Sequence, residues 1–174
     1  MKGLALAAAL CSSMALSAPI LEFNADTPSW SVLNDNVMGG VSSSRVQIKA
    51  GVLEFTGQVR LENNGGFASI RSNPGRYDLS RFSALRLRVK GDGKRYKFQL
   101  GTDQSSVTYR DEFDTVAGVW TIVTIPLASL RPTRFGRQLA GPALDPSKVT
   151  FFGFMIGNGR AEQFTLEVDW IEGL

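Results

Sequence analysis

Histidine is absent from this chain of 174 residues, and its only cysteine is Cys11. Without histidine, the chain has no Ser-His-Asp or Cys-His nucleophilic system, no imidazole base and none of the usual zinc or copper sites. No glycine-rich phosphate-binding loop lies between a strand and a helix, so nucleotide-dependent chemistry has no support. These absences favour a protein without catalytic residues, cofactor or resident metal, which holds a partner or ligand.

Long apolar runs are also missing. The one extended apolar segment, residues 4–16, is shorter than the roughly 20 residues that span a bilayer. It follows the charge of Lys2 and precedes small residues, which is the layout of a secretory signal peptide. We predict that residues 1–18 are this peptide, with cleavage after Ala15 or Ala18. Residues 19–174 then form one domain, exported to the periplasm or extracellular space without stable membrane insertion.

The net charge is small, because the chain has 19 basic and 16 acidic residues, a formal net charge of +3. Basic residues recur between 90 and 97 and between 131 and 137, but no aromatic ladder or known binding motif accompanies them. We interpret them as solvated surface and predict no nucleic acid partner.

Apolar residues alternate at period two through most of the chain, and turn residues interrupt them about every ten positions. This pattern predicts an all-β sandwich with strands centred on residues 53–59, 85–89, 96–100, 152–156 and 164–170. Residues 119–125 are apolar on both faces, as in a strand in the middle of a sandwich. Gly91–Gly93 and Asn158-Gly159 suit hairpins, and residues 130–148 look like one long loop.

Two groups of carboxylates are candidates for chemistry. Glu167 and Asp169 would share one face of the last strand, as a glycosidase pair can, and Asp111, Glu112 and Asp114 could attract calcium. Alternating charges normally mark the solvated face of a strand, and the acidic cluster lacks the spacing of a calcium loop. We interpret both groups as surface.

The most unusual stretch, residues 30–44, is polar and glycine-rich, and a related segment follows at residues 63–71. Amides, carboxylates and an aromatic face here could bind a sugar or a peptide backbone. Alternatively, the Asn and Asp side chains bond their own backbone, the glycines form a bulge, and the tryptophan lies in the core. The candidate binding residues are Trp30, Asn34, Asp35, Asn36, Met38, Gly39, Gly40, Asn63, Asn64 and Arg71.

The same two segments resemble the complex I intermediate-associated protein 30 family. The similarity is carried by Trp30, Asn34-Asp35, Met38-Gly39-Gly40 and Ser42, and by the run from Gly65 to Arg71. Later features follow in the family's order, at Lys90–Tyr96, Trp120, residues 125–127, Gly153-Phe154 and residues 164–171.

This resemblance implies a jelly-roll β-sandwich of the galactose-binding-domain-like type. It also implies a non-catalytic assembly factor or chaperone for respiratory complex I, whose partner is a subunit of a membrane complex. The alternative is an exported carbohydrate-binding module whose partner is a glycan. The family contributes no catalytic residue, which agrees with the composition.

Overall fold

The computed structural model describes residues 17–103 and 106–174. The predicted signal segment up to Leu16, with Cys11, lies outside these ranges. Within them the protein is all-β and contains no α-helix, and no helix is long and apolar enough to cross a membrane.

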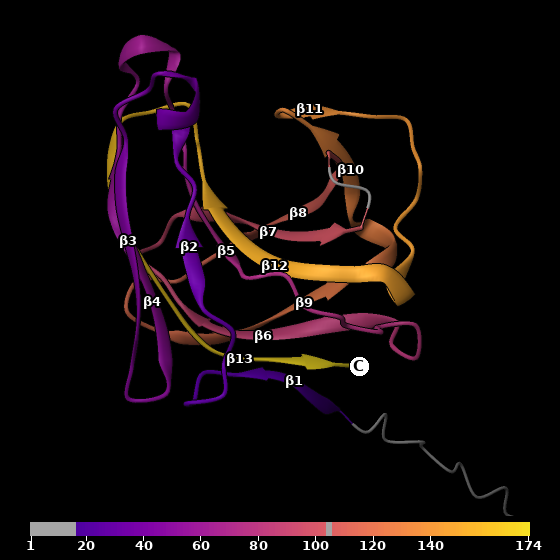
Figure 1. The fold of residues 1–174 in the computed structure, drawn as a ribbon. Helices are drawn as coiled ribbons and strands as arrows, with labels where there is room; N and C mark the ends of the chain where they lie inside the picture. Colours follow the sequence, from indigo (N-terminus) through magenta and orange to yellow (C-terminus); the bar gives the residue numbers. More distant parts are fainter. Residues whose placement is uncertain (1–16, 104–105) are drawn as a thin grey trace, which may run out of the picture.

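Two antiparallel sheets form a sandwich (Figure 1). The six-stranded sheet has the order β3-β4-β13-β6-β9, with β1 also paired to β13. The seven-stranded sheet has the order β11-β10-β8-β7-β12-β5-β2. The strands of the first sheet are β1 (Ala18–Glu22), β3 (Ser43–Lys49), β4 (Val52–Val59), β6 (Ala84–Lys90), β9 (Trp120–Pro126) and β13 (Glu162–Gly173). Those of the second are β2 (Trp30–Val32), β5 (Ala68–Ser72), β7 (Arg95–Thr102), β8 (Thr108–Asp114), β10 (Arg131–Arg134), β11 (Arg137–Gln138) and β12 (Val149–Ile156).

Four short 3-10 helices lie in the described connections: η1 (Asp35–Met38), η2 (Glu62–Asn64), η3 (Leu127–Ser129) and η4 (Pro146–Lys148). The loops of η1 and η2 rise at one end of the sandwich, at the top left of Figure 1, while β10 and β11 rise opposite them.

The core lies between the sheets and uses the alternating residues that the sequence pattern indicates. Phe55 and Leu166 from one sheet and Phe98 and Phe154 from the other are fully buried. Burying large apolar side chains is the main stabilising contribution, about 1.5–3 kcal/mol for each. The predicted all-β class and the five predicted strands are confirmed, as β4, β6, β7, β12 and β13.

The two predicted hairpins are wrong. Residues 91–94 connect β6 to β7, and residues 157–161 connect β12 to β13, so both segments pass from one sheet to the other. Gly93 and Gly159 do have the positive φ angles that tight turns use, at 84° and 71°. Turn chemistry therefore indicated where the chain reverses, but not which sheet the next strand would join.

Three further expectations need correction. β9 is an edge strand of its sheet rather than a middle strand, and Ile122 is 50% exposed. The strand 164–170 changes phase at a bulge between Val168 and Trp170, so that Ile171 rather than Trp170 enters the core. Residues 130–148 contain the hairpin of β10 and β11 and the helix η4, rather than one unstructured loop.

Candidate functional site

Asp35 is fully buried and joins the two sheets. One carboxylate oxygen accepts from the Ser42 backbone N–H at 3.0 Å, and the other from the Ser42 hydroxyl at 2.5 Å. The second oxygen also accepts from the backbone N–H groups of Gly66 at 2.7 Å and Phe67 at 3.3 Å. Ser42 directly precedes β3 and Phe67 directly precedes β5, so this one side chain ties the edge of one sheet to the other.

The hydrogen bonds also decide the charge of Asp35. Burial by itself would raise the pKa of this carboxyl group, but the bonds from the Ser42 hydroxyl and from the backbone of Gly66, Ser42 and Phe67 outweigh it. The net result is a pKa below the ordinary value, because hydrogen bonds to a carboxylate favour its charged form. Asp35 is thus a buried, ionised acceptor.

Asn34 repeats this arrangement one residue earlier. It is 5% exposed, and its side-chain oxygen accepts from the Ser44 hydroxyl at 2.8 Å and from the Ser69 backbone N–H at 3.2 Å. A Cβ atom on Gly40 would lie 2.4 Å from Cγ of Asp35, so only glycine fits beside the carboxylate. We call these bonds of Asn34 and Asp35 the Asn-Asp joint.

The outer side of the same loop is apolar. Val37 is 69% exposed and Met38 61% exposed, although both belong to η1, which is anchored by Asp35. Further exposed apolar side chains lie on the flanking segments: Val32, Leu33, Val41 and Leu61. These six residues, which we call the apolar rim, are more than half of the large hydrophobic side chains that are exposed in the described parts of the chain.

The remaining predicted residues do not meet at one cleft. Trp30 is half-buried and packs on the core side against Phe23 and Phe154, with both ring centroids 6.0 Å away. Asn36 donates to the Gly40 carbonyl at 2.9 Å, Gly39 has a φ of 91°, and Asn63 and Asn64 are exposed at φ of 57° and 59°. Trp30, Asn34 and Asp35 therefore support the fold, and Arg71 lies apart from them.

Arg71 lies on the outer face of the seven-stranded sheet, in a row that crosses six strands. The register pairs Ser31 with Arg71, Arg71 with Gly153, Gly153 with Gln99, Gln99 with Arg110 and Arg110 with Arg131. Paired residues project from the same face of an antiparallel sheet. Because their neighbours Ile70, Phe98 and Tyr109 fill the core, the row projects outward. We call Arg71, Arg110 and Arg131 the arginine row.

The arginine row has little internal charge compensation. Among residues 17–103 and 106–174, no ion pair involves any of its three members, and Arg71 lies over the Phe151 ring at 4.7 Å. The Arg110 Nε is buried without a hydrogen-bond partner in this part of the structure, and burial lowers the pKa of its guanidinium. On the adjoining row, Lys97 is 3.7 Å from Glu112 and donates to the Gly157 carbonyl at 2.7 Å.

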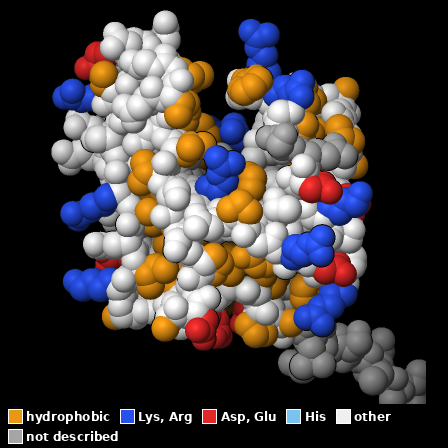
Figure 2. Space-filling view, viewed as in Figure 1, with side chains coloured by type: hydrophobic (Ala, Val, Ile, Leu, Met, Phe, Trp, Pro, Cys, Tyr) orange, Lys and Arg blue, Asp and Glu red, His pale blue; other side chains and the backbone are white. Residues whose placement is uncertain are grey.

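The outer face is also recessed. Gln99 and Met155 project outward yet are only 7% and 9% exposed, and the Phe151 ring covers Gly101, where a Cβ atom would lie 1.8 Å from it. Figure 2 shows a hollow between two raised lobes, with basic side chains reaching into it. The lobes correspond in Figure 1 to the loops of η1 and η2 and to β10 with β11. We call this recessed face the trough.

Arg131 was missed as a site residue because the sequence favoured a solvated face for the basic cluster at 131–137, and Arg110, which lies outside that cluster, was not singled out. Alternation alone would have placed Arg110 outward, since Tyr109 and Phe113 are apolar on the other face of β8. Only the strand register shows that the three arginines form one row.

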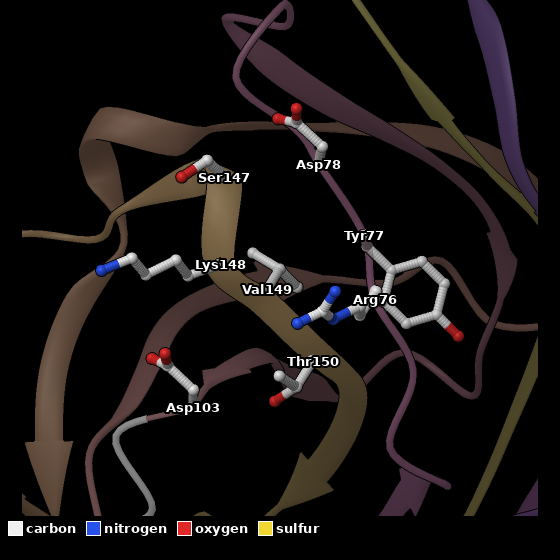
Figure 3. A pocket seen from close by; sticks show the side chains of 8 residues that line it. All are labelled: Arg76, Tyr77, Asp78, Asp103, Ser147, Lys148, Val149 and Thr150. Atoms are coloured by element: carbon white, nitrogen blue, oxygen red, sulfur yellow. The ribbon is translucent and has the colours of Figure 1, made fainter.

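A pocket of about 430 Å³ lies elsewhere, between residues 76–78, the end of β7 and the start of β12 (Figure 3). In Figure 3 the Tyr77 ring and the Lys148 amine point in opposite directions. It is lined by Arg76, Tyr77, Asp78, Asp103, Ser147, Lys148, Val149 and Thr150.

The two carboxylate groups considered from the sequence are bound by neighbours. Glu167 pairs with Lys90 at 2.5 Å, and Asp169 pairs with Arg88. Asp111 accepts from the Ser129 hydroxyl, while Arg95 binds Asp114 at 2.8 Å and approaches Glu112 to 3.7 Å. No group of three or more potential metal-ligating side chains occurs in the described ranges.

Comparison with known proteins gives matches to a family and to a relative. The model of the family described as Complex I intermediate-associated protein 30 matches residues 21–168. The mitochondrial complex I intermediate-associated protein 30 of Drosophila melanogaster is 28% identical over 168 residues, which cover 82% of this chain and 57% of the relative. The chain thus spans little more than half the length of that relative.

Solved structures match the fold. A family 11 carbohydrate-binding module of a Clostridium thermocellum cellulosomal cellulase has a TM-score of 0.68 at 16% identity, covering 91% of this chain and 94% of the module. The family 11 module of that organism in complex with a β-1,3-1,4-mixed-linked tetrasaccharide has a TM-score of 0.67 at 17% identity, covering 92% and 96%. A family 30 carbohydrate-binding module has a TM-score of 0.60 at 17% identity, covering 91% and 87%. The predicted jelly-roll sandwich of the galactose-binding-like type is confirmed.

Proposed function

Because the chain belongs to the complex I intermediate-associated protein 30 family, we propose that it is a non-catalytic protein-binding module. Its role is that of an assembly factor or chaperone for a membrane complex, which the family suggests is respiratory complex I. With the export predicted from residues 1–18, its partner is a subunit or loop on the outer side of the membrane. Beyond family membership, one structural observation carries the proposal: the apolar rim.

The apolar rim combines exposure with rigidity. Exposed apolar clusters mark protein-binding surfaces, and a contact that needs no ordering of its loop loses less conformational entropy on binding. The Asn-Asp joint anchors η1 through its buried side, while Val37 and Met38 on the other side are exposed to solvent. Methionine adapts its shape to uneven partner surfaces, which suits a protein that binds assembly intermediates.

Site-specific cross-linking tests this function. A photoreactive residue at position 37 or 38 should cross-link to a complex I subunit in intact cells, whereas the same residue at position 122 should not. Ile122 is the matched control because it is also half-exposed but lies on the outer face of the six-stranded sheet.

Genetics provides the second part of the test. Deleting the gene should lower the amount of assembled complex I, and the V37S/M38S variant should fail to restore it. Unchanged complex I in the deletion strain would refute the assembly role.

A second candidate, an exported carbohydrate-binding module, is favoured by the trough together with the fold match to glycan-binding modules. Its floor has no outward Tyr or Trp in the described strands, since Tyr96, Tyr109 and Trp30 all lie on the core side. The described strands therefore offer no Tyr or Trp stacking face in the trough, and the outward ring of Phe151 has Arg71 over it at 4.7 Å.

Calorimetry and melting curves with the mixed-linked tetrasaccharide test this candidate. Binding at 100 times the dissociation constant should add about 2.7 kcal/mol to the free energy of unfolding. No heat and no melting shift at millimolar sugar would reject it.

A further inference from the structure

We propose that the arginine row is a binding site for an acidic peptide segment, which lies along the trough and presents carboxylates to Arg71, Arg110 and Arg131. This inference rests on the proposed function, because it describes the chemistry of the protein partner, but it concerns a different surface from the apolar rim.

Charge supplies the first argument. Outward-facing cations in the trough are Arg71, Lys97, Arg110 and Arg131, and one acidic neighbour, Glu112, lies beside Lys97. Arg95 and Asp114, further along the same strands, neutralise each other at 2.8 and 3.0 Å. The trough therefore carries uncompensated positive charge, and a recessed cationic surface attracts an anionic partner strongly.

Arg110 supplies the second argument. A guanidinium group has five N–H donors in a planar fork that fits a carboxylate with two parallel hydrogen bonds. In the described part of the chain its Nε–H is buried without a partner, and an unmet buried donor destabilises the free protein. The Nε itself is out of a ligand's reach, but a carboxylate docked in the trough beside the Arg110 guanidinium places a negative charge next to a desolvated cation and offsets its loss of hydration.

The spacing supplies the third argument. Neighbouring strands lie about 4.8 Å apart, so Arg110 and Arg131 are one strand apart and Arg71 is three strands from Arg110. Between them lie the glycine floor at Gly153 and the amide of Gln99, with Phe151 and Met155 on adjoining rows. This combination of charged ends and a partly apolar middle fits a peptide with separated acidic residues and an apolar one between them.

Glycans fit this surface less well. Sugar rings pack on flat aromatic faces, and in the floor of the trough the outward ring of Phe151 is covered by Arg71. An acidic peptide would bind the guanidinium groups through its carboxylates and needs no aromatic face to stack on.

Titration of the purified chain with defined oligomers tests the inference. The probes are an octamer of L-glutamate, an octamer of L-lysine and an oligogalacturonate with eight carboxylates. We expect the glutamate octamer to bind more tightly than the oligogalacturonate, the lysine octamer not to bind, and the affinity to fall as salt rises.

Matched variants locate the site. R110Q and R71Q should each weaken binding of the glutamate octamer at least tenfold, and R110K should also weaken it because an ammonium group lacks the planar fork. R45Q is the control, since Arg45 is exposed on the outer face of β3 in the other sheet. Melting curves establish that each variant is folded. R131Q changes an exposed side chain and is therefore the variant that should disturb folding least.

Equal binding of the glutamate octamer by the parent and by folded R71Q and R131Q would overturn the inference. Tighter binding of the oligogalacturonate would also overturn it and identify the trough as an acidic-glycan site. Because the titration uses no partner protein and leaves Val37 and Met38 unchanged, it can fail while the cross-linking at position 37 succeeds, and the reverse.

Discussion

The outer faces of the two sheets use their charges differently. On the six-stranded sheet, Arg86 pairs with Glu172, Arg88 with Asp169 and Lys90 with Glu167, all between the neighbouring strands β6 and β13. On the seven-stranded sheet, the arginine row has no ion pair within the described ranges, and Arg110 is partly desolvated.

This difference in charge pairing distinguishes a surface that stabilises the fold from a surface that can bind a ligand. Paired charges on the six-stranded sheet compensate one another, and Trp120 adds cation–π contacts with Arg88 at 4.9 Å and Lys90 at 5.0 Å. Each cation of β6 therefore already has an anionic partner on β13. Cations that the fold leaves without partners remain available for a ligand, which is why we assign binding to the trough.

The largest effect should come from Asp35, since it joins the sheets that carry the two faces. Asp35→Ala removes the acceptor of four donors, three of them backbone N–H groups, and should lower the free energy of unfolding by about 3–5 kcal/mol. Urea unfolding measures this. Asn36→Ala in the same loop is the control and should cost about 1 kcal/mol or less, because it removes one hydrogen bond. A D35A variant within 1 kcal/mol of the parent would show that the joint is not needed.

Acid should weaken the same joint. The pKa of Asp35 is lowered in the folded state from its ordinary value of 3.8, so its charge contributes stability above about pH 3.8 that is lost as pH falls through the folded pKa. Between pH 5 and pH 2, the parent should therefore lose more stability than Asp35→Asn, which cannot titrate. Parallel pH profiles of the two proteins would contradict this assignment.

Removing a paired arginine should have a moderate effect. Arg88→Met breaks the ion pair with Asp169 and the contact with Trp120, and should cost about 0.5–1 kcal/mol, because both side chains of the pair are partly exposed. Thermal unfolding at low and high salt measures it, and the cost should shrink at high salt.

Removing an unpaired arginine should not lower the free energy of unfolding. Arg110→Met eliminates a desolvated donor and should leave stability unchanged or raise it by about 0.5–1 kcal/mol. If Arg110→Met were more destabilising than Arg88→Met, the arginine row would be structural and the contrast between the faces would fail.

The smallest effect should come from the apolar rim between the two faces. V37S/M38S should change the free energy of unfolding by less than about 0.5 kcal/mol, since both side chains are largely exposed. Circular dichroism melting measures this. A larger loss would mean that these side chains pack within the protein, and it would weaken their assignment to a partner.

The sequence predicted much of the local structure. Alternation in segments such as Tyr96–Leu100 gave the strands and their buried faces, because inward residues must be apolar. It failed at Trp170, where a bulge shifts the phase, and at Ile122, where an edge strand exposes an apolar residue. Residues 121–125 and 164–170 contain no glycine or proline of the kind that often marks a bulge or an edge strand.

In the candidate site, too, the sequence identified individual residues but not the partners that folding brings to them. The Asn-Asp segment was recognised as unusual from its residues, but its partners Gly66 and Phe67 are more than 30 positions away. The arginine row is spread over 60 residues of sequence and becomes one feature only through the pairing of β5, β12, β7, β8 and β10.

The sequence by itself determined the all-β class, most strand faces and the family, because alternation and short motifs act within a few residues. The tertiary structure decided that Asp35 is a buried joint, that Val37 and Met38 are left exposed, and that three distant arginines share the trough. The physical reason is that strand register and the burial of charge depend on neighbours brought together by folding, which no single segment encodes.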